Sequence, residues 1–226
     1  MIAPHSFWQV LHPPQTFPTI GPFADFYPAT LDDGRQIQLP IRALADGRNG
    51  LASLIINQAS FAVEDALADD LAQKLLPLRP DIVVGLPTLG LTLAAAVARK
   101  LGHSRYVPLG TSKKFWYDEG LSVPLSSITT PQMQKRLYVD PRMLPLLAGR
   151  RVALIDDVTS SGTSLVAGLT LLARCDIEPV VIGVAMLQSQ RWRAALGLLD
   201  PVWQSRMLGV FSTPMLHKTD DGHWAA

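Results

Sequence analysis

Hydrophobic and polar positions alternate over part of the first sixty residues in the way that half-buried β-strands require. Residues 35–42 place three apolar side chains on one side: Ile37, Leu39 and Ile41. Together with residues 26–31 and the turn 32–34, this segment predicts a β-hairpin. Residues 51–57 predict another strand, whereas the proline-rich residues 1–25 predict an extended arm.

From Ser60 onward the spacing of the apolar residues becomes helical. We expect the apolar face of this helix to be formed by Phe61, Leu67, Leu71, Leu75 and Leu76. Pro77 and Pro80 are predicted to end it, because proline cannot continue the interior of a helix.

The chain then repeats one theme, which is a short apolar strand, a loop rich in glycine and hydroxyl residues, and a helix. The strands are predicted at 82–84, 152–155 and 180–187. Apolar strands that alternate with helices indicate a parallel sheet covered on both faces. We therefore expect an α/β fold with a central parallel sheet flanked by helices, and ligands beyond the carboxyl ends of the strands.

The length of 226 residues fits a single domain. We expect its core to span residues 61–200, with a long irregular segment at 110–149. Residues 1–60 and 201–226 flank this core and are predicted to form a small accessory unit.

Composition narrows the classes of function. The net charge of +1 offers no excess of cations for a nucleic acid backbone, so we expect no nucleic acid partner. The longest uncharged stretches, 82–98 and 158–173, are broken by glycine and hydroxyl residues and predict no membrane span. The single cysteine, Cys175, fits a reducing compartment, and no signal peptide is evident, so we expect a cytoplasmic protein.

The most informative segment is 152–164. Two carboxylates, Asp156 and Asp157, follow its apolar strand directly. A dense run of hydroxyl residues around one glycine follows: Thr159, Ser160, Ser161, Gly162, Thr163 and Ser164. Hydroxyls and N–H groups at a helix N-terminus bind phosphate, whereas adjacent carboxylates accept hydrogen bonds from vicinal sugar hydroxyls. The pattern predicts a ribose 5-phosphate site, since an ordinary helix cap needs only one or two hydroxyls.

Residues 152–164 resemble the phosphoribosyl pyrophosphate (PRPP) motif of type I phosphoribosyltransferases, and the resemblance extends over roughly residues 80–190. It implies that Asp156 and Asp157 hold the ribose 2′- and 3′-hydroxyls as catalytic residues. It also implies that the hydroxyl run from Thr159 to Ser164 grips the 5′-phosphate.

A second loop, Gly85 to Gly90, also follows a predicted strand. Its two glycines have the spacing of a phosphate-binding P-loop, but Leu91 stands where that motif requires lysine. The resemblance implies instead that this loop binds pyrophosphate through Pro87, Thr88, Leu89 and Gly90. An ordinary turn from strand to helix is the alternative.

The irregular segment 110–149 corresponds in the family to a mobile lid that brings a basic residue to the pyrophosphate. The resemblance makes Lys113 and Lys114 the catalytic candidates and Lys135 and Arg136 further pyrophosphate ligands. The alternative is that these cations are solvated surface charges.

The acceptor base is less sharply defined. Hypoxanthine-guanine enzymes usually place an aspartate where this chain has Ser160, so the chain is more similar to the adenine and orotate branches. We expect a purine, adenine- or xanthine-like, bound beneath a hood formed by residues 1–60 and 201–226. Phe211 is the candidate for stacking on the base.

The resemblance therefore implies an Mg²⁺-dependent phosphoribosyltransferase of nucleotide salvage. Its substrates would be PRPP and a nucleobase, the Mg²⁺ would arrive with PRPP and keep few direct protein ligands, and the protein would be a homodimer. The alternative is a non-enzymatic regulator that senses PRPP with the same fold. A sugar-phosphate isomerase or general nucleotide binder would share the hydroxyl loop but not the acid pair.

Overall fold

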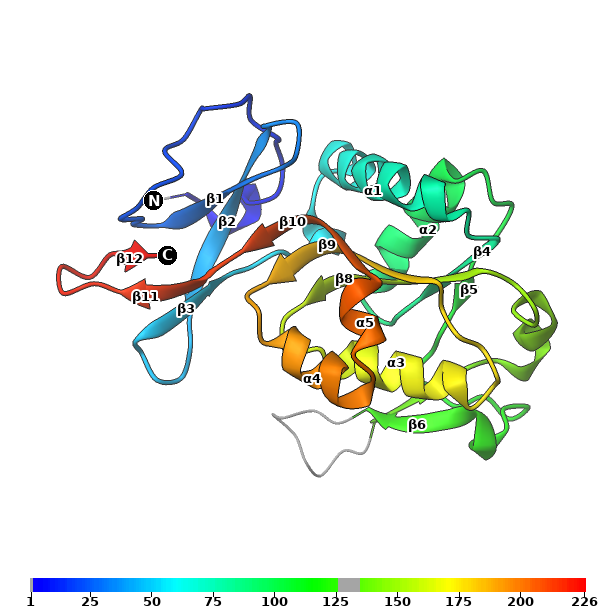
Figure 1. The fold of residues 1–226 in the computed structure, drawn as a ribbon. Coiled ribbons are helices and arrows are strands. Elements are labelled where there is room, and N and C mark those ends of the chain that lie inside the picture. Colours follow the sequence, from blue (N-terminus) through cyan, green and yellow to red (C-terminus); the bar gives the residue numbers. More distant parts are fainter. Residues whose placement is uncertain (1, 126–134) are drawn as a thin grey trace.

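The computed structural model describes residues 2–125 and 135–226, which form a core and a smaller hood (Figure 1). The core contains a five-stranded sheet in the order β10-β9-β8-β4-β5, and the hood contains another in the order β1-β2-β3-β11-β12.

All strand pairs of the core sheet are parallel. The strands are β4 (Ile82–Gly85), β5 (Val107–Pro108), β8 (Val152–Thr159), β9 (Val181–Gln188) and β10 (Met207–Thr213). Because parallel strands are joined by helical crossovers, both faces of this sheet are covered and most of its residues are buried. The predicted α/β fold with a central parallel sheet is confirmed.

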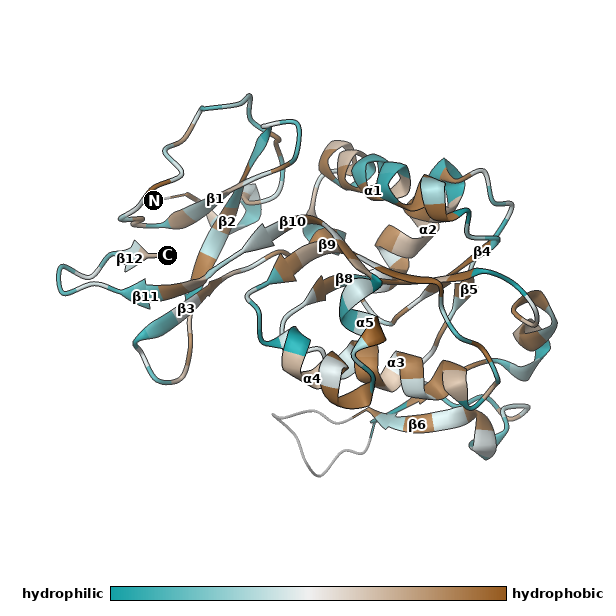
Figure 2. Ribbon diagram, viewed as in Figure 1, coloured by the Kyte–Doolittle hydropathy of each residue, from teal (hydrophilic) through white to brown (hydrophobic). Residues whose placement is uncertain are grey.

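Helices pack on both faces of the core sheet (Figure 1). One face carries α1 (Phe61–Leu75) and α2 (Gly90–Lys100), and the other carries α3 (Thr163–Ala173), α4 (Trp192–Leu199) and α5 (Val202–Ser205). Successive residues of a strand point to opposite faces, and the two hydrophobic clusters of the core accordingly take alternate residues of β8. Apolar colouring follows the strands and the helix faces turned toward them (Figure 2).

The helix predicted from Ser60 is α1, but its buried face differs from the prediction at both ends. Ser60 caps it by accepting a hydrogen bond from the Val63 N–H. Phe61 is 87% exposed, because it lies about 120° around the helix from Leu67, whereas Val63 lies about 40° from Leu67 on the buried face. Leu76 is also exposed, since it begins the 3-10 helix η3 (Leu76–Leu78) after α1 has ended.

The hood is built from antiparallel strands at both ends of the chain. They are β1 (Phe26–Thr30), β2 (Gln36–Ala43), β3 (Asn49–Ala52), β11 (Met215–Lys218) and β12 (Trp224–Ala225). The predicted hairpin is therefore confirmed. The strand predicted at 51–57 starts earlier and is shorter, because the chain turns into the 3-10 helix η2 (Ile56–Gln58).

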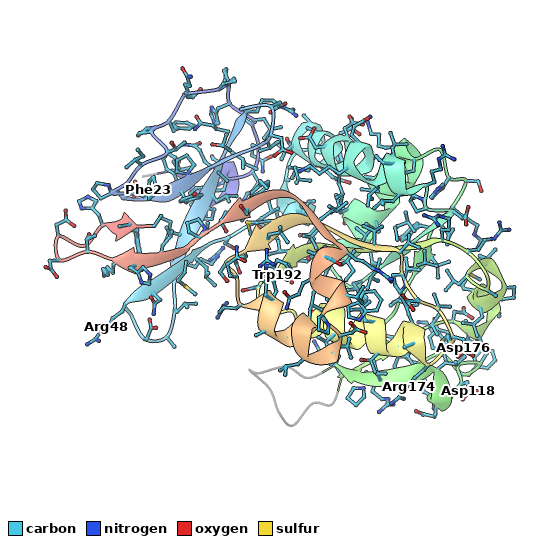
Figure 3. All side chains as sticks on the ribbon, viewed as in Figure 1. Phe23, Arg48, Asp118, Arg174, Asp176 and Trp192 are labelled. Atoms are coloured by element: carbon cyan, nitrogen blue, oxygen red, sulfur yellow. The ribbon has the colours of Figure 1, made fainter. Side chains whose placement is uncertain are left out.

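The first 25 residues lie against the hood rather than apart from it. They contain one short 3-10 helix, η1 (Pro4–Ser6). Trp8 is buried, and its Nε1 donates to the Ser53 carbonyl. Phe23, labelled in Figure 3, packs in a small cluster with Leu216 and Trp224.

One strand after residue 200 belongs to the core rather than to the hood. β10 pairs in parallel with β9 over Met207 to Thr213 and forms the edge of the core sheet. The core therefore extends beyond the predicted boundary at residue 200, and only the chain after Thr213 joins the hood.

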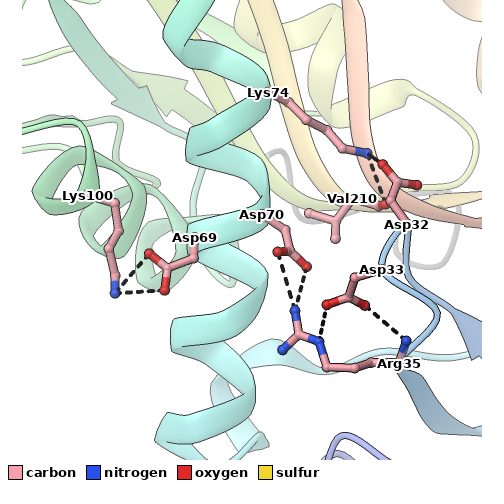
Figure 4. Close-up of polar contacts among 8 residues, drawn as sticks. All are labelled: Asp32, Asp33, Arg35, Asp69, Asp70, Lys74, Lys100 and Val210. Atoms are coloured by element: carbon pink, nitrogen blue, oxygen red, sulfur yellow. Dashed lines mark hydrogen bonds and ion pairs between the residues drawn. The ribbon is translucent and has the colours of Figure 1, made fainter. Parts of the chain in front are cut away.

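The hood is tied to the core by charged contacts at the turn between β1 and β2 (Figure 4). Arg35 pairs with Asp70 of α1 at 3.2 Å, and Lys74 of α1 pairs with Asp32 at 2.7 Å. Lys74 also donates to the carbonyls of Gly209 and Val210 on β10. These contacts fix the hood over the edge of the sheet where β10 lies.

The segment 110–149 is more regular than its sequence predicts. It contains the antiparallel pair β6 (Ser122–Leu125) and β7 (Lys135–Tyr138), with the 3-10 helices η4 (Glu119–Leu121) and η5 (Pro141–Leu146) beside it. Arg174, at the end of α3, donates to the Ser122 carbonyl at 2.8 Å (Figure 3). Part of the predicted lid, 126–134, lies outside the described residues.

Within 2–125 and 135–226, no helix has the length and apolar character needed to cross a bilayer.

Candidate active site

The acid pair lies at the carboxyl end of β8, which continues past the predicted strand end to Thr159. β8 lies between β4 and β9, so the pair occupies the middle of the edge where ligands bind in this class of fold. Asp156 and Asp157 are only 5% and 8% exposed. The Asp157 N–H donates to Oδ1 of Asp156 at 2.9 Å, which orients the first carboxylate.

Burial sets the protonation of these two carboxyls. It raises the pKa of Asp156 well above that of an ordinary aspartate, and the charge of Asp157 raises it further. Burial also raises the pKa of Asp157. Two neighbouring carboxyls that resist joint ionisation are stabilised by a hydrogen-bond donor or a cation placed between them. The vicinal hydroxyls of a ribose supply such donors.

The hydroxyl loop follows at the N-terminus of α3 and encloses a small cavity of about 130 Å³. Its lining includes Asp156 and the run from Thr159 to Ser164. Gly162 has a φ of 82°, a left-handed conformation that glycine adopts without strain. The Ser161 and Thr163 hydroxyls lie 2.9 Å apart. Hydroxyls and the first N–H groups of a helix thus converge on one cavity, which suits a phosphate.

One hydroxyl at this edge has no partner in the described residues. Thr159 is 2% exposed, and its Oγ1 makes no hydrogen bond there. Buried hydroxyls are normally satisfied, so an unpartnered one beside a cavity favours a polar ligand.

The predicted pyrophosphate loop lies directly against the acid pair. α2 begins at Gly90, and a Cβ on Gly90 would lie 2.6 Å from Oδ1 and 2.8 Å from Cα of Asp156. The Leu86 N–H donates to the Ile155 carbonyl, and the Pro87–Thr88 peptide bond is cis. The structure therefore brings together the acid pair, the hydroxyl loop and residues 87–90. A side chain at Gly90 would push the loops apart.

Comparison with known proteins identifies the family. The sequence model of the phosphoribosyl transferase domain matches residues 52–197. The chain belongs to this family. The match confirms the resemblance of residues 152–164 to the type I phosphoribosyltransferases and covers all the core strands except β10.

Relatives with curated names agree. An adenine phosphoribosyltransferase of Mycolicibacterium smegmatis is 32% identical over 138 residues, which cover 61% of this chain and 70% of that protein. One of Xanthomonas oryzae is 31% identical over 119 residues, covering 53% of this chain and 59% of that protein. The matched segment thus covers more than two thirds of the first relative's length but less than two thirds of the second's.

Solved structures share the fold. The APRTase of Giardia lamblia in complex with 9-deazaadenine superposes with a TM-score of 0.57 at 21% identity, covering 70% of this chain and 83% of that one. Adenine phosphoribosyltransferase of Thermoanaerobacter pseudethanolicus gives a TM-score of 0.54 at 18% identity, covering 67% and 81%.

Two of the four cations predicted to bind pyrophosphate contact other residues in the structure. Lys113 pairs with Glu119, and Arg136 donates to the Ser122 hydroxyl at 3.0 Å. Lys114 and Lys135 are exposed. Their roles at the pyrophosphate stay predictions.

The aromatic residues that follow the two lysines form a small cluster. Trp116 donates to Asp140 and stacks under the Arg142 guanidinium, which lies 4.3 Å from the ring centroid. The hydrogen bond from Arg142 lowers the pKa of Asp140 to about 2. An ionised Asp140 therefore anchors Trp116 and holds this part of the segment in place.

Phe211, the predicted stacking partner of the base, lies in the core. It is 5% exposed and packs in the cluster that includes residues of α1 and β9. Its position on β10 points it at the helices rather than at a cavity, so the structure offers no support for base stacking by this residue.

One polar residue at the site escaped the sequence analysis. Arg191, just before α4, donates from Nη2 to the Ser160 hydroxyl at 2.6 Å. A cation thus lies at the hydroxyl loop. The only signal in the sequence was its place shortly after the strand at 180–187, on the edge where ligands are expected.

The donor set suits a metal ion that arrives with its substrate. Mg²⁺ keeps several waters and binds through one or two carboxylates together with substrate phosphates. Asp156 and Asp157 could supply those carboxylates. Within the described part of the chain, no group of three or more potential ligand side chains is gathered for a metal ion.

Proposed function

We propose that this protein transfers the 5-phosphoribosyl group of PRPP to a purine nucleobase and releases pyrophosphate, as a reaction of nucleotide salvage. One observation carries the proposal. The buried acid pair, the hydroxyl loop and residues 87–90 meet at one edge of the core sheet, with Gly90 in contact range of Asp156. Membership of the family and the names of its curated relatives support the same reaction.

The parts of the site suggest a division of labour. The N-terminus of α3 and its hydroxyls would bind the 5′-phosphate, with charge-assisted hydrogen bonds of about 1.5–3 kcal/mol each. Asp156 and Asp157 would hold the 2′- and 3′-hydroxyls and so fix the orientation of C1′. Residues 87–90 would bind the pyrophosphate through backbone N–H groups. Positioning and charge stabilisation are then the main contributions of the protein.

The reaction exchanges one bond at C1′ for another. The C1′–O bond to pyrophosphate breaks, and the pyrophosphate keeps the electron pair. A ring nitrogen of the base forms the new bond from the opposite side and loses its proton to water. We propose that Lys113 and Lys114 stabilise the charge of the pyrophosphate from segment 110–149; Mg²⁺ bound with PRPP and held by Asp156 and Asp157 would supply further positive charge there.

The acceptor we propose is a purine of the adenine or xanthine type. The curated relatives are named for adenine, which supports the purine class. We further propose a cytoplasmic homodimer, with the reduced Cys175 in keeping with that compartment.

The test is pyrophosphate release from PRPP and Mg²⁺ with a panel of nucleobases. The proposal expects release that depends on a purine, with one nucleotide formed per pyrophosphate. Tight PRPP binding without release for any base would favour the regulator that senses PRPP. Absence of both binding and release would reject both functions.

A further inference from the structure

Arg191 brings a positive charge to the hydroxyl loop from outside the segment 152–164. The residue is exposed just before α4, and its Nη2 donates to the Ser160 hydroxyl at 2.6 Å. A guanidinium carries five N–H donors. Among the described residues, the other four donors of Arg191 make no hydrogen bond and the group makes no ion pair. These four donors are therefore available to a ligand beside the loop.

The backbone that carries Arg191 is held in a strained conformation. Ser189 is 4% exposed and has a φ of 62°, in the left-handed region that residues other than glycine rarely adopt. Its N–H donates to the Thr213 carbonyl at 2.8 Å, and its carbonyl accepts from Nε1 of the buried Trp192 at 3.1 Å (Figure 3). Strain of this kind persists only where the surrounding structure imposes it, and it is concentrated at ligand sites.

The same backbone packs against the hydroxyl loop. A Cβ on Gly162 would lie 3.2 Å from the carbonyl oxygen and 3.3 Å from the Cα of Trp192. Because Gly162 immediately precedes α3, the start of α4 lies against the N-terminus of α3. The segment after β9 is thus joined to this loop twice, by its backbone and by the Arg191 side chain.

The cavity at the hydroxyl loop has no cation of its own. It is lined by residues 156 and 158–165, which include the carboxyl of Asp156 and no lysine or arginine. The N-terminus of a helix contributes only about half an elementary charge, whereas a phosphate monoester carries about −1.5 to −2 at neutral pH. The loop alone therefore leaves most of that charge uncompensated. The guanidinium of Arg191 supplies a full positive charge at Ser160, which lines the cavity.

We propose that Arg191 is a further ligand of the 5′-phosphate and that it makes the site select a phosphorylated sugar. One N–H of Nη2 holds the Ser160 hydroxyl, and the remaining N–H groups donate to phosphate oxygens. No bond at this phosphate is made or broken in the transfer, so Arg191 contributes equally to the binding of substrate and transition state. The inference rests on the proposed function, which puts the 5′-phosphate in this loop.

The experiment measures, by calorimetry, the affinity for ribose 5-phosphate and, in parallel, for PRPP with Mg²⁺. We expect Arg191→Gln to weaken the binding of both by at least about tenfold, because charge-assisted hydrogen bonds are lost. Arg191→Lys keeps the charge but not the planar fork and should lose less.

The matched control is Arg193→Gln, which removes the same charge two residues further along. The Arg193 guanidinium lies over the Trp192 ring, 4.7 Å from its centroid. This variant should keep the wild-type affinity to within about twofold, since salt screens a charge that makes no contact with the ligand. Equal weakening by Arg191→Gln and Arg193→Gln would overturn the inference, because the effect would then be one of overall charge.

A double-mutant cycle separates contact with the phosphate from positioning of the loop. Ser160→Ala removes the hydroxyl that Arg191 holds in the free protein. If Arg191 binds the phosphate directly, Arg191→Gln should still weaken ribose 5-phosphate binding by a similar factor in the Ser160→Ala background. An effect that vanishes in that background would overturn the inference, since Arg191 would then act only through Ser160.

Steady-state kinetics separate this inference from the proposed function. With PRPP as the varied substrate, Arg191→Gln should raise KM and leave kcat within about twofold of the wild type, because uniform binding is lost. A fall in kcat with unaltered ribose 5-phosphate binding would reject the phosphate contact and keep the transferase. Binding that depends on Arg191, with no turnover for any base, would keep the contact and reject the transferase. A wild type that binds neither ribose 5-phosphate nor PRPP would reject both.

Discussion

Two neighbouring parts of one sheet edge differ in how they are made. The end of β8 takes its acid pair and hydroxyl loop from the contiguous residues 152–164, whereas the loop that carries Arg191 follows β9 and is held by Thr213 of β10 and Trp192 of α4. The first part would bind a ligand fragment common to the whole family, and the second would add a cation that the motif lacks. Contiguous residues can be recognised as a motif, but a contact assembled from distant segments emerges only with the fold.

The largest expected effect comes from moving residues 87–90 away from Asp156, which would disrupt the site at the end of β8. Gly90→Ala places a Cβ where the backbone and carboxylate of Asp156 already lie, so one loop must move. A shift of about 1 Å at a reacting centre costs on the order of a hundredfold, and we expect that loss in kcat/KM.

Gly110→Ala is the control for this change, because a Cβ there meets nothing within 4 Å and its φ is not positive. Steady-state kinetics with PRPP as the varied substrate measure both variants. Wild-type kcat/KM in Gly90→Ala would show that the packing of these loops has no part in activity.

A smaller effect is expected from the lysines of segment 110–149. Replacing Lys113 and Lys114 by Ala should lower kcat by about tenfold, because each removes positive charge from the pyrophosphate in the transition state. The affinity for the nucleotide product, which lacks pyrophosphate, should change far less. Product binding by calorimetry beside kcat separates the two effects, and equal losses in both would remove these lysines from the pyrophosphate site.

How much of the structure can be predicted from the sequence depends on where the informative residues lie along the chain. The acid pair and its strand could be read because strand, carboxylates and helix start follow one another within a few residues. Phe61 was placed on the wrong face because it was counted for its apolar character, although at about 100° per residue it lies off the face that carries Val63 and Leu67. Thr213 gave no signal, and Arg191 gave only its place shortly after a predicted strand, since neither is near the motif in sequence.

β10 teaches the same lesson at the level of the fold. Its residues Met207 to Thr213 include a glycine and polar positions, and they follow the last recognisable repeat of strand, loop and helix. Its place as the edge strand of the core sheet is shown by its pairing with β9. The hydrogen bonds from Lys74 to the Gly209 and Val210 carbonyls agree with that place. Phe211 was accordingly expected in the hood but lies in the core.

The smallest expected effect is on the free energy of unfolding, and it concerns the acid pair at the end of β8. The raised pKa of Asp156 means that the folded protein binds more protons than the unfolded chain between the ordinary aspartate pKa and the raised value. Stability must therefore fall as pH rises through that window. Asp156→Asn removes this cost, and we expect it to raise the unfolding free energy at pH 7 and with it the melting temperature.

At a pH below the ordinary aspartate pKa, the same variant should gain nothing, since both states then hold the proton. Melting curves of wild type and Asp156→Asn at several pH values give the comparison. A pH-independent difference would mean that the carboxyl of Asp156 is not held protonated by burial.

The most direct measurement is the affinity of the protein for PRPP with Mg²⁺, compared between the wild type and the double variant Asp156→Asn, Asp157→Asn. Both side chains keep their size, so the fold and the hydroxyl loop should persist, while the carboxyl groups that would ionise on binding the two ribose hydroxyls are lost. We predict PRPP binding by the wild type and at least about a hundredfold weaker binding by the variant. Equal affinities would contradict a ribose-binding role for the acid pair, and no binding by the wild type would contradict the PRPP site itself.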